Sequence, residues 1–90
     1  MPRFSPGMLA ITPGCLEAFR RSGDDPLSFI RRHLEGDWGD LDPVDVTENE
    51  LSLIRGYRLL SAYHLADNTK IWCITEADRS ATTLLLPEEY

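Results

Sequence analysis

The 90-residue sequence lacks long apolar runs, internal repeats and low-complexity tracts. Its first residues, MPRFSPGMLAITPG, contain an apolar run that is too short for the core of a signal peptide. No segment approaches the length of apolar helix that spans a bilayer. We therefore expect a cytoplasmic protein without a membrane anchor, folded as a single domain over residues 1–90, with little order in residues 1–7.

The sequence also lacks the spacings that mark many catalytic and metal-binding proteins. It contains no GxSxG, P-loop, GxGxxG or HExxH pattern and no zinc-finger spacing. Its two cysteines, Cys15 and Cys73, lie far apart and have no CxxC partner. We predict that both are reduced, buried core residues, and a single disulfide between them is the alternative. No cofactor is predicted.

The stretch HLEGDWGDLDP, residues 33–43, resembles a metal-binding loop at first sight. Asp37, Asp40 and Asp42 would supply three hard oxygen ligands, as calcium requires. An EF-hand loop that began at Asp37 would need acidic or amide side chains at its third and fifth positions. Gly39 and Leu41 occupy those positions, so the pattern fails and no metal site is predicted.

Charge is unevenly distributed along the chain. Residues 35–50 contain seven of the fifteen acidic residues and none of the nine basic ones, in a chain of net charge −6. Nonspecific nucleic-acid binding requires cations that replace the counterions of phosphates, so an acidic chain disfavours it. We interpret residues 35–50 either as a solvated acidic face or as a docking surface for a protein with a basic surface. The paired arginines 20–21 and 31–32 are expected to neutralise this segment, or to form a small phosphate-facing patch.

Three segments in the first 56 residues each combine an N-cap residue, a following proline and a terminal glycine, as helices do. The predicted helices run from Thr12-Pro13 to Gly23, from Asp25-Pro26 to Gly36 and from Asp42-Pro43 to Gly56. A Thr47-x-x-Glu50 capping box offers a later start for the third helix. The apolar positions of that helix available for the core are Val44, Val46, Leu51 and Ile54.

After Gly56 the apolar residues are mainly β-branched or aromatic, and short polar turns separate them. YRLLSAYHL, KIWCITEA and ATTLLLP are predicted strands, and MLAIT near the N-terminus is a fourth. A two-residue turn at Asp67-Asn68 would place Tyr63 opposite Trp72. The predicted fold class is α+β in the order β-α-α-α-β-β-β, with the helices packed on one face of a 3–4-stranded antiparallel sheet. The last strand, TTLLLP, is a candidate edge for a homodimer.

Trp38 lies in a glycine-flanked acidic turn. Such an indole either fills the core of a small domain or stands out as an anchor for a partner. The absence of catalytic motifs and the acidic segment together favour a non-enzymatic protein-interaction or regulatory module. The candidate binding residues of this hypothesis are Trp38, Asp37, Asp40, Asp45 and Glu48.

Two sets of polar residues are candidates for catalysis. His33 with Glu35 and Asp37 has the groups for acid–base chemistry, although a histidine in the last turn of a helix also interacts favourably with the helix dipole. The second set lies on the predicted sheet, and small bacterial ribonuclease toxins carry comparable residues on a comparable sheet. Such enzymes usually need a basic groove, whereas this chain is acidic. The candidates of this alternative, a small nuclease-like toxin, are His64, Glu76 and Arg79, with Arg58 and Asp78 beside them.

The segments GDWGDL, ENELSL, RLLSAYHL and TKIWCITEADRSATTLLLPEEY resemble a group of small uncharacterised bacterial proteins that includes hypothetical and plasmid-related ones. The likeness covers residues 8–90, with Asn68 where glycine is expected at a hairpin tip. The resemblance implies a bacterial, intracellular protein associated with a mobile element. An accessory role such as inhibition of a host nucleic-acid-binding protein would suit the acidity. The resemblance implies no catalytic residue.

Overall fold

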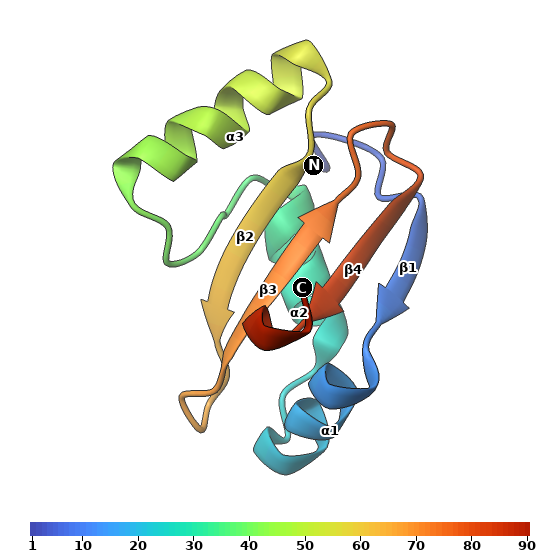
Figure 1. Cartoon of the computed structure of the whole chain (residues 1–90), viewed down its shortest axis with the longest axis vertical. Helices are drawn as coiled ribbons and strands as arrows, with labels where there is room; N and C mark the ends of the chain where they lie inside the picture. Colours follow the sequence, from blue (N-terminus) through green and yellow to red (C-terminus); the bar gives the residue numbers. More distant parts are fainter.

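The computed structural model describes residues 1–90 and contains the helices and strands in the predicted order, followed by a short 3-10 helix (Figure 1). The bounds are β1 Met8–Ile11, α1 Pro13–Ser22, α2 Pro26–Leu34, α3 Pro43–Arg55, β2 Leu59–His64, β3 Lys70–Thr75, β4 Ala81–Leu85 and η1 Pro87–Glu89. None of the helices is both long and apolar enough to cross a membrane. The α+β class is confirmed.

The four strands form one mixed sheet in the order β1-β4-β3-β2. β2, β3 and β4 are antiparallel neighbours, whereas β1 runs parallel to β4. The prediction of an antiparallel sheet is therefore wrong at β1. A short hairpin turn forces two strands to be antiparallel, but β1 and β4 are joined by most of the chain, which permits either direction. β4 is an interior strand, so the predicted dimer edge TTLLLP is not an edge of the sheet.

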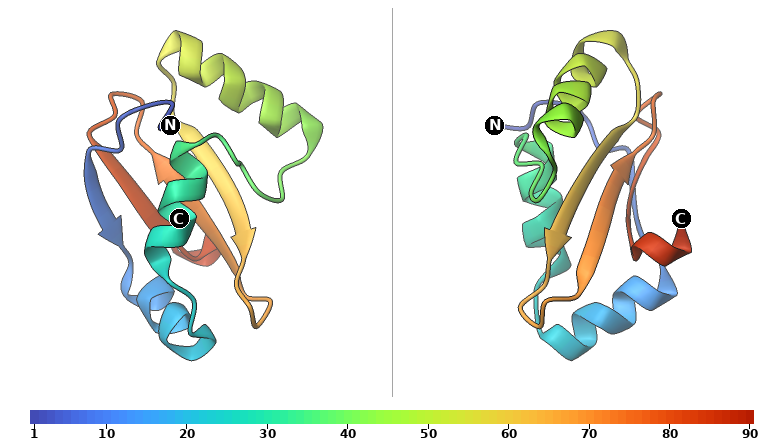
Figure 2. Two further views of the ribbon diagram at one scale, coloured as in Figure 1. Left: turned by 180° about the vertical axis from the view of Figure 1, so that it is seen from behind. Right: turned by 60° about the vertical axis from the view of Figure 1, so that its left-hand side comes forward.

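The helices do not share one face of the sheet, as the sequence led us to expect. α2 packs across one face of the sheet, α1 lies at one end of the sheet, and α3 lies along the β2 edge (Figure 2). Cys15 and Cys73 are free and buried in the core, where burial raises the pKa of the Cys15 thiol to about 11. The core cluster consists of Cys15, Ala18, Phe19, Phe29, Ile30, Tyr63, Leu65, Ile71, Cys73 and Leu84.

The predicted caps determine where the helices begin. Thr12, Asp25 and Asp42 each accept a hydrogen bond from a backbone N–H in the first turn of the helix that follows. α3 therefore begins at Pro43, and the alternative start at Thr47 is wrong. The Thr47 hydroxyl instead donates to the backbone carbonyl one turn earlier, at 3.0 Å, and so supports a helix that has already begun.

The first hairpin has a three-residue loop, 66–68, rather than the predicted two-residue turn. Asn68 adopts a left-handed conformation with φ of 72°, as the last residue of such loops commonly does. The additional loop residue shifts the register by one position. Tyr63 consequently pairs with Ile71, and the predicted pair of Tyr63 with Trp72 is wrong. The two aromatic side chains point to opposite faces of the sheet.

Residues 1–7, for which little order was expected, contact the body of the domain. The Arg3 guanidinium pairs with Glu50 on α3 at 2.8 Å. The Phe4 ring stacks on Trp38 with 6.4 Å between ring centres. These contacts join the N-terminal segment to both the acidic segment and α3.

Candidate functional site

The acidic segment, residues 35–50, occupies the β2 edge of the sheet. After α2 the chain crosses to this edge, where Gly39 forms an isolated parallel bridge with Ala62 of β2. α3 then runs along the edge (Figure 1). A Cβ atom on residue 39 would lie 2.0 Å from the Ala62 carbonyl oxygen, and φ is +74° there, so the close approach requires glycine. The second glycine of GDWGDL is thus explained by local structure.

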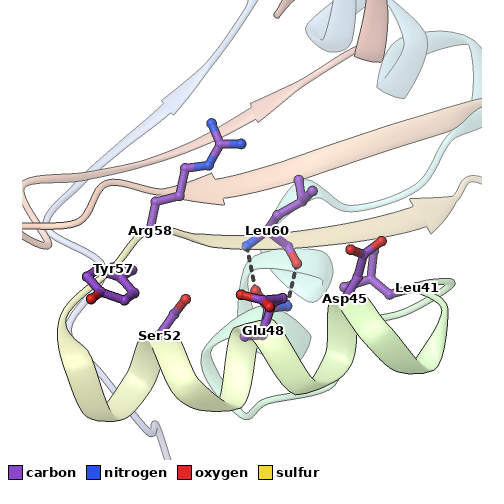
Figure 3. A pocket seen from close by; sticks show the side chains of 8 residues that line it. Leu41, Asp45, Glu48, Ser52, Tyr57, Arg58 and Leu60 are labelled. Carbon is purple, nitrogen blue, oxygen red and sulfur yellow. Dashed lines mark hydrogen bonds between the residues drawn. The ribbon is translucent and has the colours of Figure 1, made fainter.

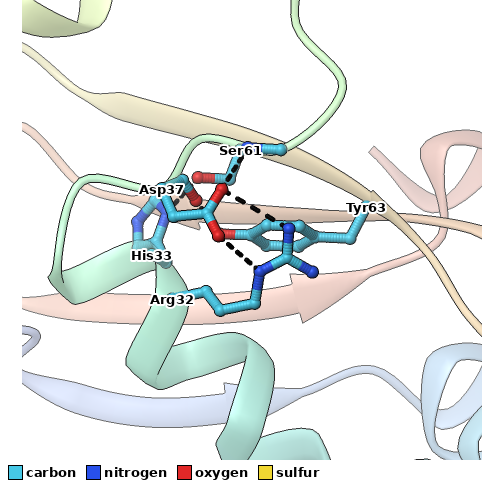
Figure 4. Close-up of polar contacts among 6 residues, drawn as sticks. Arg32, His33, Asp37, Ser61 and Tyr63 are labelled. Carbon is cyan, nitrogen blue, oxygen red and sulfur yellow. Dashed lines mark hydrogen bonds and ion pairs between the residues drawn. The ribbon is translucent and has the colours of Figure 1, made fainter.

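Asp37, one of the expected binding residues, is already paired within the chain. Arg32 Nε donates to Asp37 Oδ2 at 2.7 Å, and the Gly39 N–H donates to Oδ1 at 3.2 Å (Figure 4). The hydrogen bond from Arg32 lowers the pKa of Asp37 below its ordinary value. The Arg32 guanidinium also lies 4.5 Å from the centre of the Tyr63 ring. Arg32 is the only member of the two arginine pairs that forms an ion pair with the acidic segment.

Trp38 is a core residue. Its side chain is 4% exposed, stacks on Phe4, and meets the His33 ring edge-on at 5.7 Å. Its Nε1–H donates to Glu50 Oε2 at 2.9 Å. The backbone pairing of its loop with β2 places the indole against the domain, so Trp38 has almost no exposed surface with which to anchor a partner. The alternative interpretation, that it fills the core, is confirmed.

The candidates of the nuclease-like alternative do not form one site. His64 ends β2, and its Nδ1 lies 2.6 Å from Oδ2 of Asp40, another of the expected binding residues. Glu76 and Arg79 follow β3 at the opposite end of the β2–β3 pair, roughly 17 Å away at the usual rise of a strand. Arg79 has a structural role, because its guanidinium donates to the backbone carbonyls of Ser52, Tyr57, Glu76 and Ala77.

Asp45 and Glu48 line a groove of about 280 Å³ between α3 and β2 (Figure 3). Neither carboxylate forms an ion pair. Arg58 borders the groove, and Asn49 joins α3 to β2 beneath it through two hydrogen bonds to the backbone of Leu60. Among the predicted binding residues, Asp45 and Glu48 are the two that remain available to a partner.

The outward side of α3 carries an exposed surface of three apolar side chains and one threonine, which the sequence interpretation missed. Its four residues follow one another at intervals of three, four and three, so they share one face of the helix. Val44 is 69% exposed and Ile54 is 81% exposed. The members of this surface, called the α3 stripe below, are Val44, Thr47, Leu51 and Ile54.

The α3 stripe faces outward because polar residues occupy the inner side of the helix. Asn49 and Ser52 are the only buried residues of α3. Asn49 bonds to the open backbone of β2, a role that an apolar side chain could not fill. The prediction that Val44, Leu51 and Ile54 belong to the core is therefore wrong. The spacing of Asn49 and Ser52, one turn apart opposite the apolar residues, is the sequence signal that would have indicated the orientation.

His33 is completely buried rather than exposed at the end of α2. Its Nδ1 lies 2.5 Å from Ser61 Oγ, and its Nε2 lies 2.9 Å from Thr75 Oγ1. Thr75 in turn contacts Thr82 Oγ1 at 2.7 Å, and the Thr82 hydroxyl donates to the Pro6 carbonyl at 2.8 Å.

The directions of the hydrogen bonds from His33 Nε2 through Thr75 and Thr82 follow from the last acceptor, the Pro6 carbonyl. A carbonyl only accepts and each hydroxyl has one hydrogen, so Thr82 must accept from Thr75, and Thr75 must accept from His33 Nε2–H. His33 therefore carries a proton on Nε2, and Nδ1 accepts from Ser61 when the ring is neutral. Burial lowers the pKa of His33 to about 4.

A serine hydroxyl bonded to a histidine nitrogen is also an element of nucleophilic enzymes. Here both Ser61 and His33 have no exposed surface, so a substrate cannot reach the hydroxyl. The second ring nitrogen contacts a threonine, whereas a catalytic histidine is commonly oriented by a carboxylate. The row therefore joins α2 to β2, β3 and β4 as a structural network.

No family model matches the chain, and the comparisons with curated proteins and with solved structures found no significant match. The resemblance of GDWGDL and the C-terminal segment to small bacterial plasmid-related proteins therefore stays a prediction.

Proposed function

We propose that the protein is a non-enzymatic interaction module that binds a basic, amphipathic helix of a partner protein along α3. The observation that carries this proposal is the α3 stripe, an exposed and largely apolar surface with Ile54 81% exposed, beside carboxylates that have no ion-pair partner. Isolated exposed apolar residues are common, but an aligned set on a helix is typical of interaction surfaces.

The spacing of the α3 stripe fits a helical partner. Residues 44, 47, 51 and 54 have the alternating intervals of three and four by which two helices pack side by side. An amphipathic helix would place its own apolar positions between those of α3. α3 lies at the edge of the domain rather than beneath it, so this side of the helix is open to an incoming element (Figure 2).

Charge specifies the chemistry of the partner. Asp42, Asp45 and Glu48 lie on or next to the first half of α3 and form no ion pair, whereas Glu50 is neutralised by Arg3. Lysine or arginine residues beside the apolar positions of the partner would face these carboxylates. Such pairs at the rim of an interface mainly accelerate association and make it sensitive to salt. A nucleic-acid-binding protein would present such a basic surface, which supports an inhibitory or accessory role as one form of the same function.

A defined probe tests the proposal. The probe is a synthetic amphipathic helix of leucine and lysine, and its control is the same peptide with glutamate in place of lysine. Fluorescence anisotropy should show binding of the lysine peptide and weaker binding at high salt. Ile54→Glu should weaken binding at least about tenfold, equivalent to about 1.4 kcal/mol, and Glu48→Lys should reduce its salt dependence.

The matched control is Leu27→Glu, because Leu27 is an exposed leucine of α2, 57% exposed and remote from α3. This variant should bind the lysine peptide like the unmodified protein. Equal binding of both peptides, or equal losses for Ile54→Glu and Leu27→Glu, would contradict the proposal. Affinity capture of cellular partners with the unmodified protein and with Ile54→Glu would then identify the natural ligand.

A further inference from the structure

The β2 edge of the sheet is closed by the chain itself. The Asn49 side-chain amide donates to the Leu60 carbonyl at 2.6 Å and accepts from the Leu60 N–H at 3.1 Å. Ala62 is the next residue of β2 whose backbone groups point away from β3. Its N–H donates to the Trp38 carbonyl at 3.1 Å, and its carbonyl accepts from the Asp40 N–H at 2.7 Å. Another chain cannot pair with β2 unless it displaces these groups.

The β1 edge is open. The N–H groups of Met8 and Thr12 donate to carbonyls on the β4 side, at 2.9 and 3.0 Å. In a parallel pair alternate residues bond to the neighbouring strand, so Leu9 and Ile11 point their N–H and C=O groups away from β4. No element lies outside β1 in Figure 1. Residues 4–16 contain no charged side chain, so β1 lacks the charges by which edge strands usually avoid pairing.

An apolar groove of about 190 Å³ lies beside this edge, between β1, α1 and α2. No charged residue lines it. Leu9 is 48% exposed and Leu27 is 57% exposed, so a strand added to β1 would cover both the open backbone and these leucines. The side chains that form the groove include Leu9, Ile11, Leu16, Leu27, Ile30 and Leu84.

We propose that the β1 edge is a homodimer interface, occupied by β1 of a second copy in antiparallel orientation. A two-fold axis through Ala10 places Leu9 of each copy opposite Ile11 of the other. Both residues direct their N–H and C=O groups outward, so each of these two pairs exchanges two hydrogen bonds. The edge is therefore complementary to itself in this register. The two sheets become one continuous sheet.

The distribution of charge favours a second copy over a charged peptide. The acidic segment lies along β2, at the opposite edge of the sheet from β1. Dimerisation through β1 consequently keeps the two acidic segments at the far ends of the combined sheet, where their repulsion is screened. The interface itself is uncharged and apolar on both sides. The α3 stripes also remain exposed, so this inference does not depend on the function proposed above.

Sedimentation equilibrium of the full chain tests the dimer. The mass should rise with concentration from 10.2 kDa toward twice that value. Ile11→Pro removes an N–H that the monomer does not use, so it should reduce association at least about tenfold without loss of the fold. Leu9→Lys places a charge in the interface and should have a similar effect. Ile54→Lys, on the α3 stripe, is the control and should leave association unchanged.

If Ile11→Pro fails to fold, hydrogen exchange of the unmodified protein provides an independent test of the dimer. In the unmodified protein the amides of Leu9 and Ile11 should exchange more slowly as concentration rises, whereas the Ala10 amide should be protected at every concentration. A chain that remains monomeric at high concentration would overturn the proposal. So would a dimer that Leu9→Lys leaves intact, because a different surface would then hold it.

Discussion

The indole N–H of Trp38 donates to the Glu50 carboxylate at 2.9 Å, and the Arg3 guanidinium binds the same carboxylate at 2.8 Å. One acidic side chain thus connects the loop after α2, the middle of α3 and the N-terminal segment. Arg3 provides the largest contribution to lowering the pKa of Glu50. Part of the acidic segment is consequently structural, and the charge available to a partner is concentrated at Asp42, Asp45 and Glu48.

Replacing this indole should destabilise the fold. Trp38→Phe keeps an aromatic ring but removes the N–H donor, so the free energy of unfolding should fall by about 1–2 kcal/mol. Trp38→Ala should cost about 3–5 kcal/mol, since it also leaves a cavity. Urea denaturation measures both losses. The control is Trp72→Phe, because Trp72 is only partly buried on the other face of the sheet. Equal losses at positions 38 and 72 would contradict the role given to Trp38.

The buried histidine should make stability depend on pH. Its pKa is about 4 in the folded protein against 6.5 when exposed, so the folded state binds fewer protons. The stability is therefore complete above pH 6.5 and is lost as the pH falls toward and through 4. Protonation of His33 alone should remove about 3 kcal/mol by pH 4.

Urea midpoints measured from pH 7 to pH 4 check this dependence. His33→Gln retains a polar side chain but removes the titrating group, so its stability should change much less between pH 6.5 and 5. His64 is present in both proteins, and its contribution cancels in the comparison. The same slope in both proteins would show that His33 is not the group responsible.

The buried network that joins His33, Thr75 and Thr82 should become less stable when one of its hydroxyl groups is removed. Thr75→Val preserves the shape of the side chain but leaves His33 Nε2–H without an acceptor and removes the hydrogen that Thr75 donates to Thr82. Unfolding free energy should fall by about 1–3 kcal/mol, the usual cost of unsatisfied buried polar groups. Thr83→Val is the matched control, because Thr83 lies next to Thr82 but on the opposite face. That variant should differ from the unmodified protein by less than about 0.5 kcal/mol.

Arg79 should contribute to stability through its hydrogen bonds to backbone carbonyls. Arg79→Met removes those donors while keeping an apolar stem, so we expect a loss of about 1–3 kcal/mol. Arg79→Gly should cost less than Arg79→Met, because φ is 62° at this position and glycine adopts that conformation without strain. Thermal or urea unfolding ranks the two variants. A larger loss for glycine would show that the methionine stem or the backbone, rather than the guanidinium, determines stability here.

The sequence predicted the local features of the fold well. Thr12, Asp25 and Asp42 begin the three helices because a capping side chain acts on amides only two or three residues away. The order of helices and strands follows from similar local signals. The position of the first hairpin was predicted correctly, but the length of its loop was not. Asn68 adopts a left-handed conformation in the three-residue loop, and residue propensity permits this conformation without requiring it.

The candidate site was predicted less well. Asp45 and Glu48 form no ion pair, whereas Asp37 is paired with Arg32 and Trp38 is buried. The partners of these two residues are set by how the loop after α2 meets β2, and no spacing in the sequence expresses that contact. Val44, Leu51 and Ile54 were assigned to the core because the orientation of α3 also depends on such a contact, between Asn49 and β2.

The amino-acid sequence by itself determined the helix ends, the element order, the α+β class and the concentration of acidic residues in one segment. Each of these features depends on composition or on residues that are close to one another in the sequence. Only the tertiary structure decided the direction of β1, the burial of His33 and the side of α3 that faces solvent. These depend on backbone and side-chain groups that are distant in sequence and must satisfy one another once they are removed from water.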